Sequence, residues 1–196
     1  MIPLIDIYQF DSIGQTLKDP ERTPIICATS RLVEQKGYDI AVQAILNLAQ
    51  KYGRFRSHLP VFILGGAGDA NYFELLMKLK DKVAEVDKKT AERIYVFRGY
   101  KDEFAYAIQL ASDFYMMPCR FEPCGLTQLI ALRYGTIPIV RETGGLKDTV
   151  SPYNEYENSG NGFSFGNYDS YDMLNVINYA KTIYFTQNEK WQEIII

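Results

Sequence analysis

Residues 120–135, RFEPCGLTQLIALRYG, place a carboxylate and a thiol directly before a segment whose pattern predicts a helix. Pro123 fits the first turn of such a helix. Glu122 would then lie beside the positive end of the helix dipole, which favours its ionised form. The next residues would offer backbone N–H groups that have no helical partner and can bind an anion; they are Gly125, Leu126 and Thr127. This combination suits a ligand with phosphate at one end and hydroxyl groups at the other, such as a nucleotide sugar.

Two cations occur in the short segment 30–37, SRLVEQKG, which follows an apolar run. Arg31 offers a planar fork of donors and Lys36 a point charge, so together they could clamp a diphosphate. Taken alone, the same segment is more typical of an ordinary solvated loop.

Three further loops carry groups that could contact a nucleotide. Thr143 and Gly144 open the segment TGGLKDTV, which can present a run of backbone N–H groups to an anion. Tyr100 follows an apolar run and could stack on a base, or simply pack. The segment 64–72, LGGAGDANY, is not a G-x-G-x-x-G motif, because Asn71 stands where the last glycine would be. A tight turn is the favoured interpretation of that segment.

Alternating apolar runs and amphipathic segments indicate the elements that position these loops. Short β-branched runs predict strands buried on both faces; they are residues 23–30, 60–66, 94–100, 113–119 and 137–140. The segments between them predict helices; they are residues 38–53, 71–86, 101–111 and 126 onward. This order predicts an α/β fold, a Rossmann-like three-layer α/β/α domain with a parallel sheet. Ligands bind at the carboxyl ends of such strands, where these loops meet.

The later part of the chain gives more specific expectations. The helix from residue 126 onward is expected to pack an apolar face on the core; that face consists of Leu126, Leu129, Ile130 and Leu132. Cys124 is interpreted as a small, buried lining residue. The stretch 151–165, SPYNEYENSGNGFSF, is expected to form a loop insertion before its last three residues, FSF, and residues 168–196 to form two helices.

Length and composition limit the possible functions. With 196 residues, 47% of them hydrophobic, the chain predicts a lead-in at 1–22 and a single domain at 23–196. A net charge of −3 argues against nucleic acid, and no apolar run is long enough to cross a membrane. Three cysteines without a C-x-x-C pair favour reduced thiols in a cytoplasm. The one histidine, His58, lies in a polar connection, which argues against zinc sites and histidine-dependent triads.

Three motifs together resemble the family of bacterial glycogen synthases and plant starch synthases, glycosyltransferase family 5. They are SRLVEQKG, FEPCGLTQLIALRYG and RETGGLKDTV, and their order and spacing are similar to those of the family. The resemblance runs from about residue 23 to residue 150, more loosely through NGFSF. It implies the GT-B architecture, in which two Rossmann-like domains face a cleft, and this chain looks like the C-terminal, sugar-nucleotide-binding half. The N-terminal acceptor-side domain is expected to lie outside these residues.

The resemblance also implies roles for individual residues. Arg31 and Lys36 match residues that hold the diphosphate and stabilise the leaving ADP, and Glu122 matches a carboxylate that binds sugar hydroxyls and is required for activity. The residues that match the turn contacting the sugar and distal phosphate are Cys124, Gly125, Leu126 and Thr127. Tyr100 matches an aromatic residue that lies against the adenine. Thr143 and Gly144 match the loop nearest the phosphates.

The implied activity is the retaining transfer of glucose from ADP-glucose to an α-1,4-glucan, with no metal ion and no other cofactor. The glucan acceptor would be held by the domain outside this chain, so the chain alone is expected to be inactive. The sequence departs from related families at Ile130, where those carry a second glutamate, and at Cys119, where a serine is usual. Two alternatives stay open: a non-catalytic nucleotide-binding module, and a GT-B transferase that uses another donor such as UDP-glucose.

Overall fold

A computed structural model of the chain describes residues 23–52, 59–99 and 101–194. In this part of the chain, six parallel strands form one sheet in the order β3-β2-β1-β4-β5-β6. The strands are β1 (Ile25–Thr29), β2 (Val61–Gly66), β3 (Ile94–Arg98), β4 (Phe114–Met117), β5 (Ile137–Arg141) and β6 (Phe163–Phe165). Five of them occupy the predicted runs. The sixth, β6, comes from NGFSF and extends the sheet at one edge beside β5.

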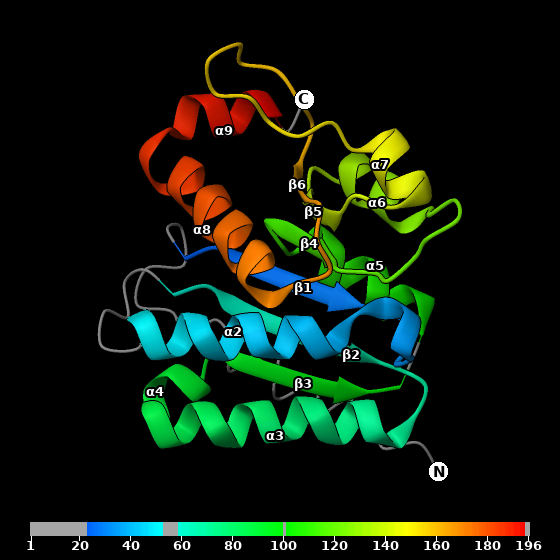
Figure 1. Cartoon of the computed structure of the whole chain (residues 1–196), viewed down its shortest axis with the longest axis vertical. Coiled ribbons are helices and arrows are strands. Elements are labelled where there is room, and N and C mark those ends of the chain that lie inside the picture. Colours follow the sequence, from blue (N-terminus) through cyan, green and yellow to red (C-terminus); the bar gives the residue numbers. More distant parts are fainter. Residues whose placement is uncertain (1–22, 53–58, 100, 195–196) are drawn as a thin grey trace.

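Helices cover both faces of the sheet, so the predicted three-layer α/β/α fold is confirmed (Figure 1). One layer contains α2 (Tyr38–Tyr52), α3 (Ala70–Val86), α8 (Ser170–Thr186) and α9 (Asn188–Ile194). The other contains α5 (Asp102–Leu110), α6 (Thr127–Arg133) and α7 (Gly144–Thr149). Two short turns, η1 (Glu34–Lys36) and α4 (Lys88–Ala91), complete the described elements. The two predicted C-terminal helices are α8 and α9.

The strands are apolar on both sides because each side of the sheet packs on a helical layer. In β1, Ile26 belongs to the core under α2, α3 and α8, whereas its neighbour Cys27 belongs to the core under α5, α6 and α7. Strand β4 alternates in the same way, with Phe114 on the first side and Tyr115 on the second. Successive side chains of a strand point to opposite faces, which is why the runs read as continuously apolar.

The amphipathic pattern of α3 gives the predicted packing. Leu76, Leu79 and Val83 are fully buried on one side of the helix. Asp69 caps its first turn, since its side chain accepts a hydrogen bond of 2.9 Å from the backbone N–H of Asn71. Periodicity and cap together set where this helix starts and which face it buries.

The prediction for α6 is wrong in two respects. The helix begins at Thr127, so Pro123 lies outside it rather than in its first turn. Half of its expected apolar face is also turned outward: Leu126 is 70% exposed and Leu129 is 42% exposed, whereas Ile130 and Leu132 are half-buried. The buried residues of this short helix are Gln128 and Ala131. Gln128 donates from Nε2 to the Gly125 carbonyl at 2.8 Å and to Thr149 Oγ1 at 3.0 Å. These hydrogen bonds, rather than apolar periodicity, set the rotation of the helix.

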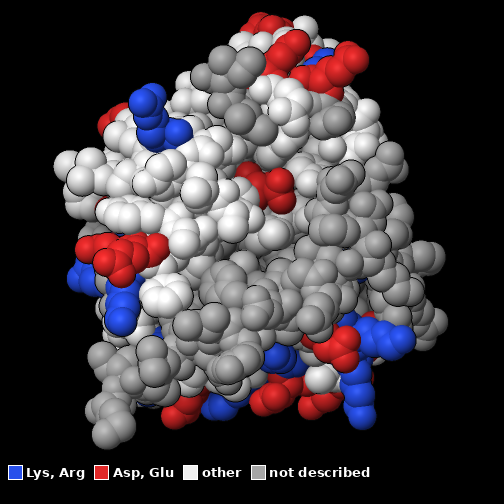
Figure 2. All heavy atoms as spheres, turned by 180° about the vertical axis from the view of Figure 1, so that it is seen from behind, with Lys and Arg blue, Asp and Glu red and all other residues white. Residues whose placement is uncertain are grey.

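The surface agrees with the modest net charge. Figure 2, which views the molecule from behind, shows the positive and negative side chains of the described residues mixed along the margins, where they form no continuous basic area. No helix in the described ranges has the length and apolar character needed to cross a membrane.

Candidate functional site

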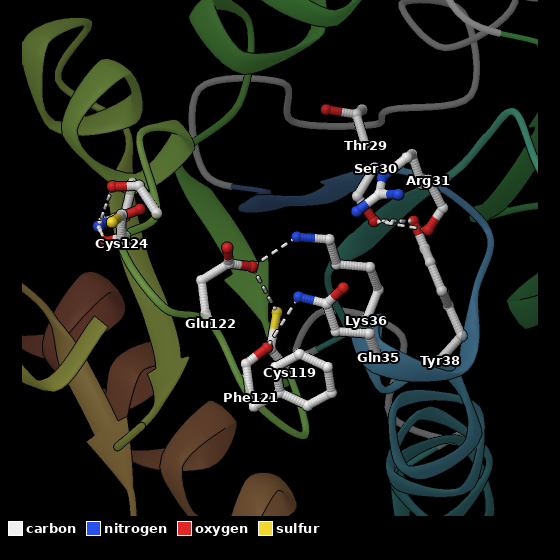
Figure 3. A network of polar contacts seen from close by, with 12 residues as sticks. Thr29, Ser30, Arg31, Gln35, Lys36, Tyr38, Cys119, Phe121, Glu122 and Cys124 are labelled. Atoms are coloured by element: carbon white, nitrogen blue, oxygen red, sulfur yellow. Dashed lines mark hydrogen bonds and ion pairs between the residues drawn. The ribbon is translucent and has the colours of Figure 1, made fainter. Parts of the chain in front are cut away.

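The candidate site lies where the strand order reverses. The chain runs outward from β1 through β2 to β3 and then returns to the other side of β1 with β4. In open α/β sheets, ligands bind at the carboxyl ends of the strands at such a switch point. The loop after β1 carries Arg31 and Lys36, and the loop after β4 carries Glu122. The structure therefore brings the predicted cations and the predicted carboxylate to one edge of the sheet (Figure 3).

Lys36 and Glu122 form an ion pair at this edge, with 2.5 Å between Nζ and Oε2. Both side chains are largely buried, with exposed fractions of 14% and 12%. Lys36 ends η1, and Gly37 follows it in a left-handed conformation with φ of 71°. A Cβ at Gly37 would lie 1.9 Å from the carbonyl oxygen of Pro118, so only glycine lets this turn rest against the β4 loop. Glycine at this position therefore permits the close approach of the cation to the carboxylate.

Cys119 is a third member of this cluster. Its Sγ lies 3.6 Å from Glu122 Oε2 and donates a weak hydrogen bond to the carboxylate. Burial raises the pKa of the Cys119 thiol to about 12, with Glu122 raising it further and Lys36 opposing. The thiol therefore remains protonated near neutral pH, as a hydrogen-bond donor rather than a nucleophile. The sequence analysis treated Cys119 only as a substitution for serine. Its position three residues before Glu122 was the signal that could have marked it as a hydrogen-bond donor to that carboxylate.

Arg31 is exposed and lies on the side of Lys36 that faces Ser30 and Tyr38 (Figure 3). Within the described ranges its guanidinium has no hydrogen-bond or ion-pair partner. The Tyr38 hydroxyl, 3.0 Å from Ser30 Oγ and 3.1 Å from the Gly65 carbonyl, ties this loop to the start of α2. A cavity beside the loop is lined in part by Ser30, Lys36, Tyr38 and Thr127. The rest of the cavity lining is mostly apolar, and Arg31 lies outside it, as a cation without a partner for its guanidinium among the described residues.

The turn between Glu122 and α6 has a defined backbone. Gly125 adopts φ of 67°, and a Cβ there would lie 2.5 Å from Oε1 of buried Gln128. The N–H groups of Gly125, Leu126 and Thr127 have no hydrogen-bond partner among the described residues. The predicted set of free donors is therefore present, but it arises from a turn before the helix rather than from a helix that starts at Pro123. Cys124 is exposed, so the expectation that it is buried is wrong.

The segment that contains Thr143 and Gly144 rests directly on this turn. The N–H of Gly145 donates to the Glu122 carbonyl at 3.0 Å and to the Pro123 carbonyl at 3.2 Å. A Cβ at Gly144 would lie 2.2 Å from the Glu122 carbonyl oxygen. Both glycines are needed for this approach, and α7 begins there as expected, with Thr143 at its N-cap position. The structure thus joins the two predicted anion-binding segments through their backbones.

Two predictions concern residues outside this cluster. Tyr100, the candidate for stacking on a base, and His58 lie outside the described residues. No group of three or more metal-ligating side chains comes together in the described part of the chain. Independence from metal ions therefore stays a prediction.

The strand order, with the cluster at its switch point, defines a Rossmann-like α/β domain. The sequence pattern of the family described as Glycosyl transferases group 1 matches residues 9–194, and the chain belongs to that family.

Individual relatives are more specific. The chain is 41% identical over 171 residues to a glycogen synthase of Lachnospira eligens, which covers 87% of this chain and 33% of that protein. It is 45% identical over 175 residues to a glycogen synthase of Clostridium kluyveri, with coverages of 89% and 34%. The resemblance to the glycogen synthases is thereby confirmed, and the chain spans about a third of the length of these relatives.

Solved structures agree with this relationship. The catalytic domain of starch synthase IV from Arabidopsis thaliana, bound to ADP and acarbose, superposes with a TM-score of 0.74 at 28% identity, over 97% of this chain and 37% of that one. Sucrose-phosphate synthase from Thermosynechococcus elongatus gives a TM-score of 0.64 at 21% identity over 95% of this chain and 43% of that one. The second likeness shows the shared fold alone.

Proposed function

We propose that this chain is the donor-binding domain of a glycogen synthase, which transfers glucose from ADP-glucose to an α-1,4-glucan with retention. The observation that carries the proposal is the Lys36–Glu122 pair at the switch point, beside the free N–H groups of residues 125–127. The relatives named glycogen synthase and the ADP-bound starch synthase support the choice of reaction and nucleotide.

In this proposal the cations serve the leaving group. The bond between the anomeric carbon and the diphosphate oxygen breaks, and its electron pair stays on ADP. Lys36 and the free guanidinium of Arg31 offset the charge that develops there, and loss of one such donor typically slows a reaction by about 10²–10³-fold. The acceptor hydroxyl oxygen forms the new bond to the anomeric carbon, and its proton passes to the diphosphate oxygen that departs with ADP.

Glu122 serves the sugar. Its carboxylate accepts hydrogen bonds, and two donors of the chain, Lys36 Nζ and Cys119 Sγ, converge on a single oxygen, Oε2. The other oxygen, Oε1, would accept from sugar hydroxyls. The N–H groups of Gly125 and Thr127 would bind the distal phosphate, and those of the loop at Thr143 and Gly144 would lie near the diphosphate. Tyr100 would stack on the adenine.

The proposal extends to partners and location. Because the chain spans a third of its relatives, we assign the glucan acceptor to the remainder of such a protein and expect binding rather than turnover from this chain. Its three cysteines are free thiols, which supports a reducing, cytoplasmic location. Neither nucleic acid nor a membrane is proposed as a partner, and no cofactor is required.

Calorimetry with the purified chain tests the proposal. ADP-glucose should bind, and UDP-glucose and GDP-glucose should bind at least about tenfold more weakly. A preference for UDP-glucose would support a transferase with another donor. Equal affinities for ADP and ADP-glucose would mean that the glucose moiety is not recognised, and would support a non-catalytic nucleotide-binding module instead. Absence of binding by all three would refute the proposal.

A further inference from the structure

Arg141 holds the backbone of the loop that leads to Glu122. It is the last residue of β5, and its guanidinium donates from Nε to the Cys119 carbonyl at 2.7 Å. It also donates from Nη2 to the Arg120 carbonyl and from Nη1 to the Gly166 carbonyl, the latter at 3.3 Å. One planar fork therefore fixes two successive peptide groups of the β4 loop.

The next two carbonyls of the same loop are held from other elements. The Phe121 carbonyl accepts from Gln35 Nε2 at 3.0 Å, and the Glu122 carbonyl accepts from the Gly145 N–H at 3.0 Å. Four consecutive carbonyls, from residue 119 to residue 122, thus each accept a hydrogen bond from outside the loop. A loop with this many fixed peptide groups presents its side chains in one arrangement.

The Arg141 guanidinium is itself held in place. Its Cζ lies 5.6 Å from the centroid of the Tyr168 ring, and the Arg120 Cζ lies 4.3 Å from the same centroid. Tyr168 donates its hydroxyl proton to Asp39, which also pairs with Arg120 Nη2 at 2.8 Å. These contacts set the plane of the fork that reaches the β4 loop.

All three guanidinium nitrogens of Arg141 donate to carbonyl oxygens of the chain. Three of the five N–H groups of this guanidinium are therefore committed to the backbone, in contrast to the free guanidinium of Arg31. We therefore expect Arg141 to act on a ligand chiefly through the loop that it holds.

We propose that Arg141 is a positioning residue that fixes the β4 loop so that Glu122 meets Lys36 and can accept hydrogen bonds from the sugar. The proposal rests on the function proposed above for Glu122. Lysine keeps the charge of Arg141 but presents one donor atom, which cannot hold both the Cys119 and the Arg120 carbonyls in the same way.

A ligand-free experiment tests the first part. In nitrogen-15 spectra of the chain, proton exchange of the Lys36 ammonium reports its pairing with Glu122. Arg141→Lys should accelerate this exchange several-fold, and Gln35→Ala, which removes the donor to Phe121, should do so to a smaller extent. The control is Arg93→Lys, because Arg93 Nη1 donates to the Leu59 carbonyl at 2.6 Å, away from this loop. Unchanged Lys36 exchange in folded Arg141→Lys and Gln35→Ala chains would overturn the proposal.

A double-mutant cycle tests the link to the ligand. Arg141→Lys should weaken ADP-glucose binding about tenfold in the chain with Glu122, and less than about twofold in the Glu122→Gln chain. ADP affinity should change far less than ADP-glucose affinity. Equal losses in both backgrounds would show that Arg141 acts on stability or charge alone and would overturn the positioning role. If the unaltered chain fails to bind ADP-glucose, the proposed function fails, while the Lys36 exchange measurement still decides the role of Arg141.

Discussion

Lys36 Nζ and Glu122 Oε2 lie 2.5 Å apart, although 86 positions separate the two residues in the sequence. Each side chain is the principal counter-charge of the other in a largely buried setting. A diphosphate that binds here must therefore share Lys36 with a carboxylate, and this competition has measurable consequences.

Glu122→Gln should strengthen the binding of ADP. The change removes a negative charge from the neighbourhood of the diphosphate and releases Lys36 from its ion pair, while it keeps the size of the side chain. We expect ADP to bind about threefold to tenfold more tightly and ADP-glucose to bind more weakly, because the sugar loses its acceptor. Titration calorimetry measures both affinities, and weaker binding of ADP by the variant would contradict the competition.

Lys36→Met should destabilise the chain because it leaves Glu122 partly buried without its partner. We expect a loss of about 1–3 kcal/mol in the free energy of unfolding. The matched control is Lys78→Met, since Lys78 is 71% exposed and 4.0 Å from Glu74, and its loss should stay within about 0.5 kcal/mol. Urea denaturation measures both; equal losses would show that the Lys36–Glu122 pair adds nothing to stability.

Gly145→Ala should be strongly destabilising. A Cβ at this position would lie 1.7 Å from the Cys124 carbonyl oxygen, a backbone atom that cannot move without displacing the turn at Glu122. We expect a loss of about 2 kcal/mol or more in the free energy of unfolding. Gly166→Ala is the control, because no atom lies within 4 Å of the added Cβ. A Gly145→Ala chain as stable as the Gly166→Ala chain would mean that the two segments do not interlock.

Asp113 should make the chain less stable as pH rises from about 4 to about 6. Burial raises the pKa of Asp113 from 3.8 to about 6, against the opposing hydrogen bond from the Ile25 N–H. Between these values the folded chain retains a proton that the unfolded chain has released, so each increase in pH favours unfolding. The full effect is about 3 kcal/mol. Asp113→Asn should remove most of this slope in denaturation curves between pH 4 and 7; an unchanged slope would assign it to other groups.

The alternation of elements was predictable because strands buried on both faces and amphipathic helices have different periods. The same information predicted that the loops after β1 and β4 lie at one edge of the sheet, since parallel strands end at the same edge, but not that these two strands are neighbours. The orientation of α6 could not be predicted: Leu126 and Leu129 have helical spacing, but the hydrogen bonds of Gln128 turn them outward. Arg141 was overlooked because its partners are carbonyl oxygens, which leave no pattern in the sequence.

By itself the sequence determined the fold class, the resemblance to the glycogen synthases and the loops that hold the candidate cations and carboxylate. These properties depend on local periodicity and on short contiguous motifs. Only the tertiary structure decided that Lys36 pairs with Glu122, that Cys119 donates to the same carboxylate, and that Arg141 holds the intervening loop. The reason is physical: these contacts join side chains and peptide groups far apart in the chain, and their geometry exists only after the strands have assembled in the order that places β1 beside β4.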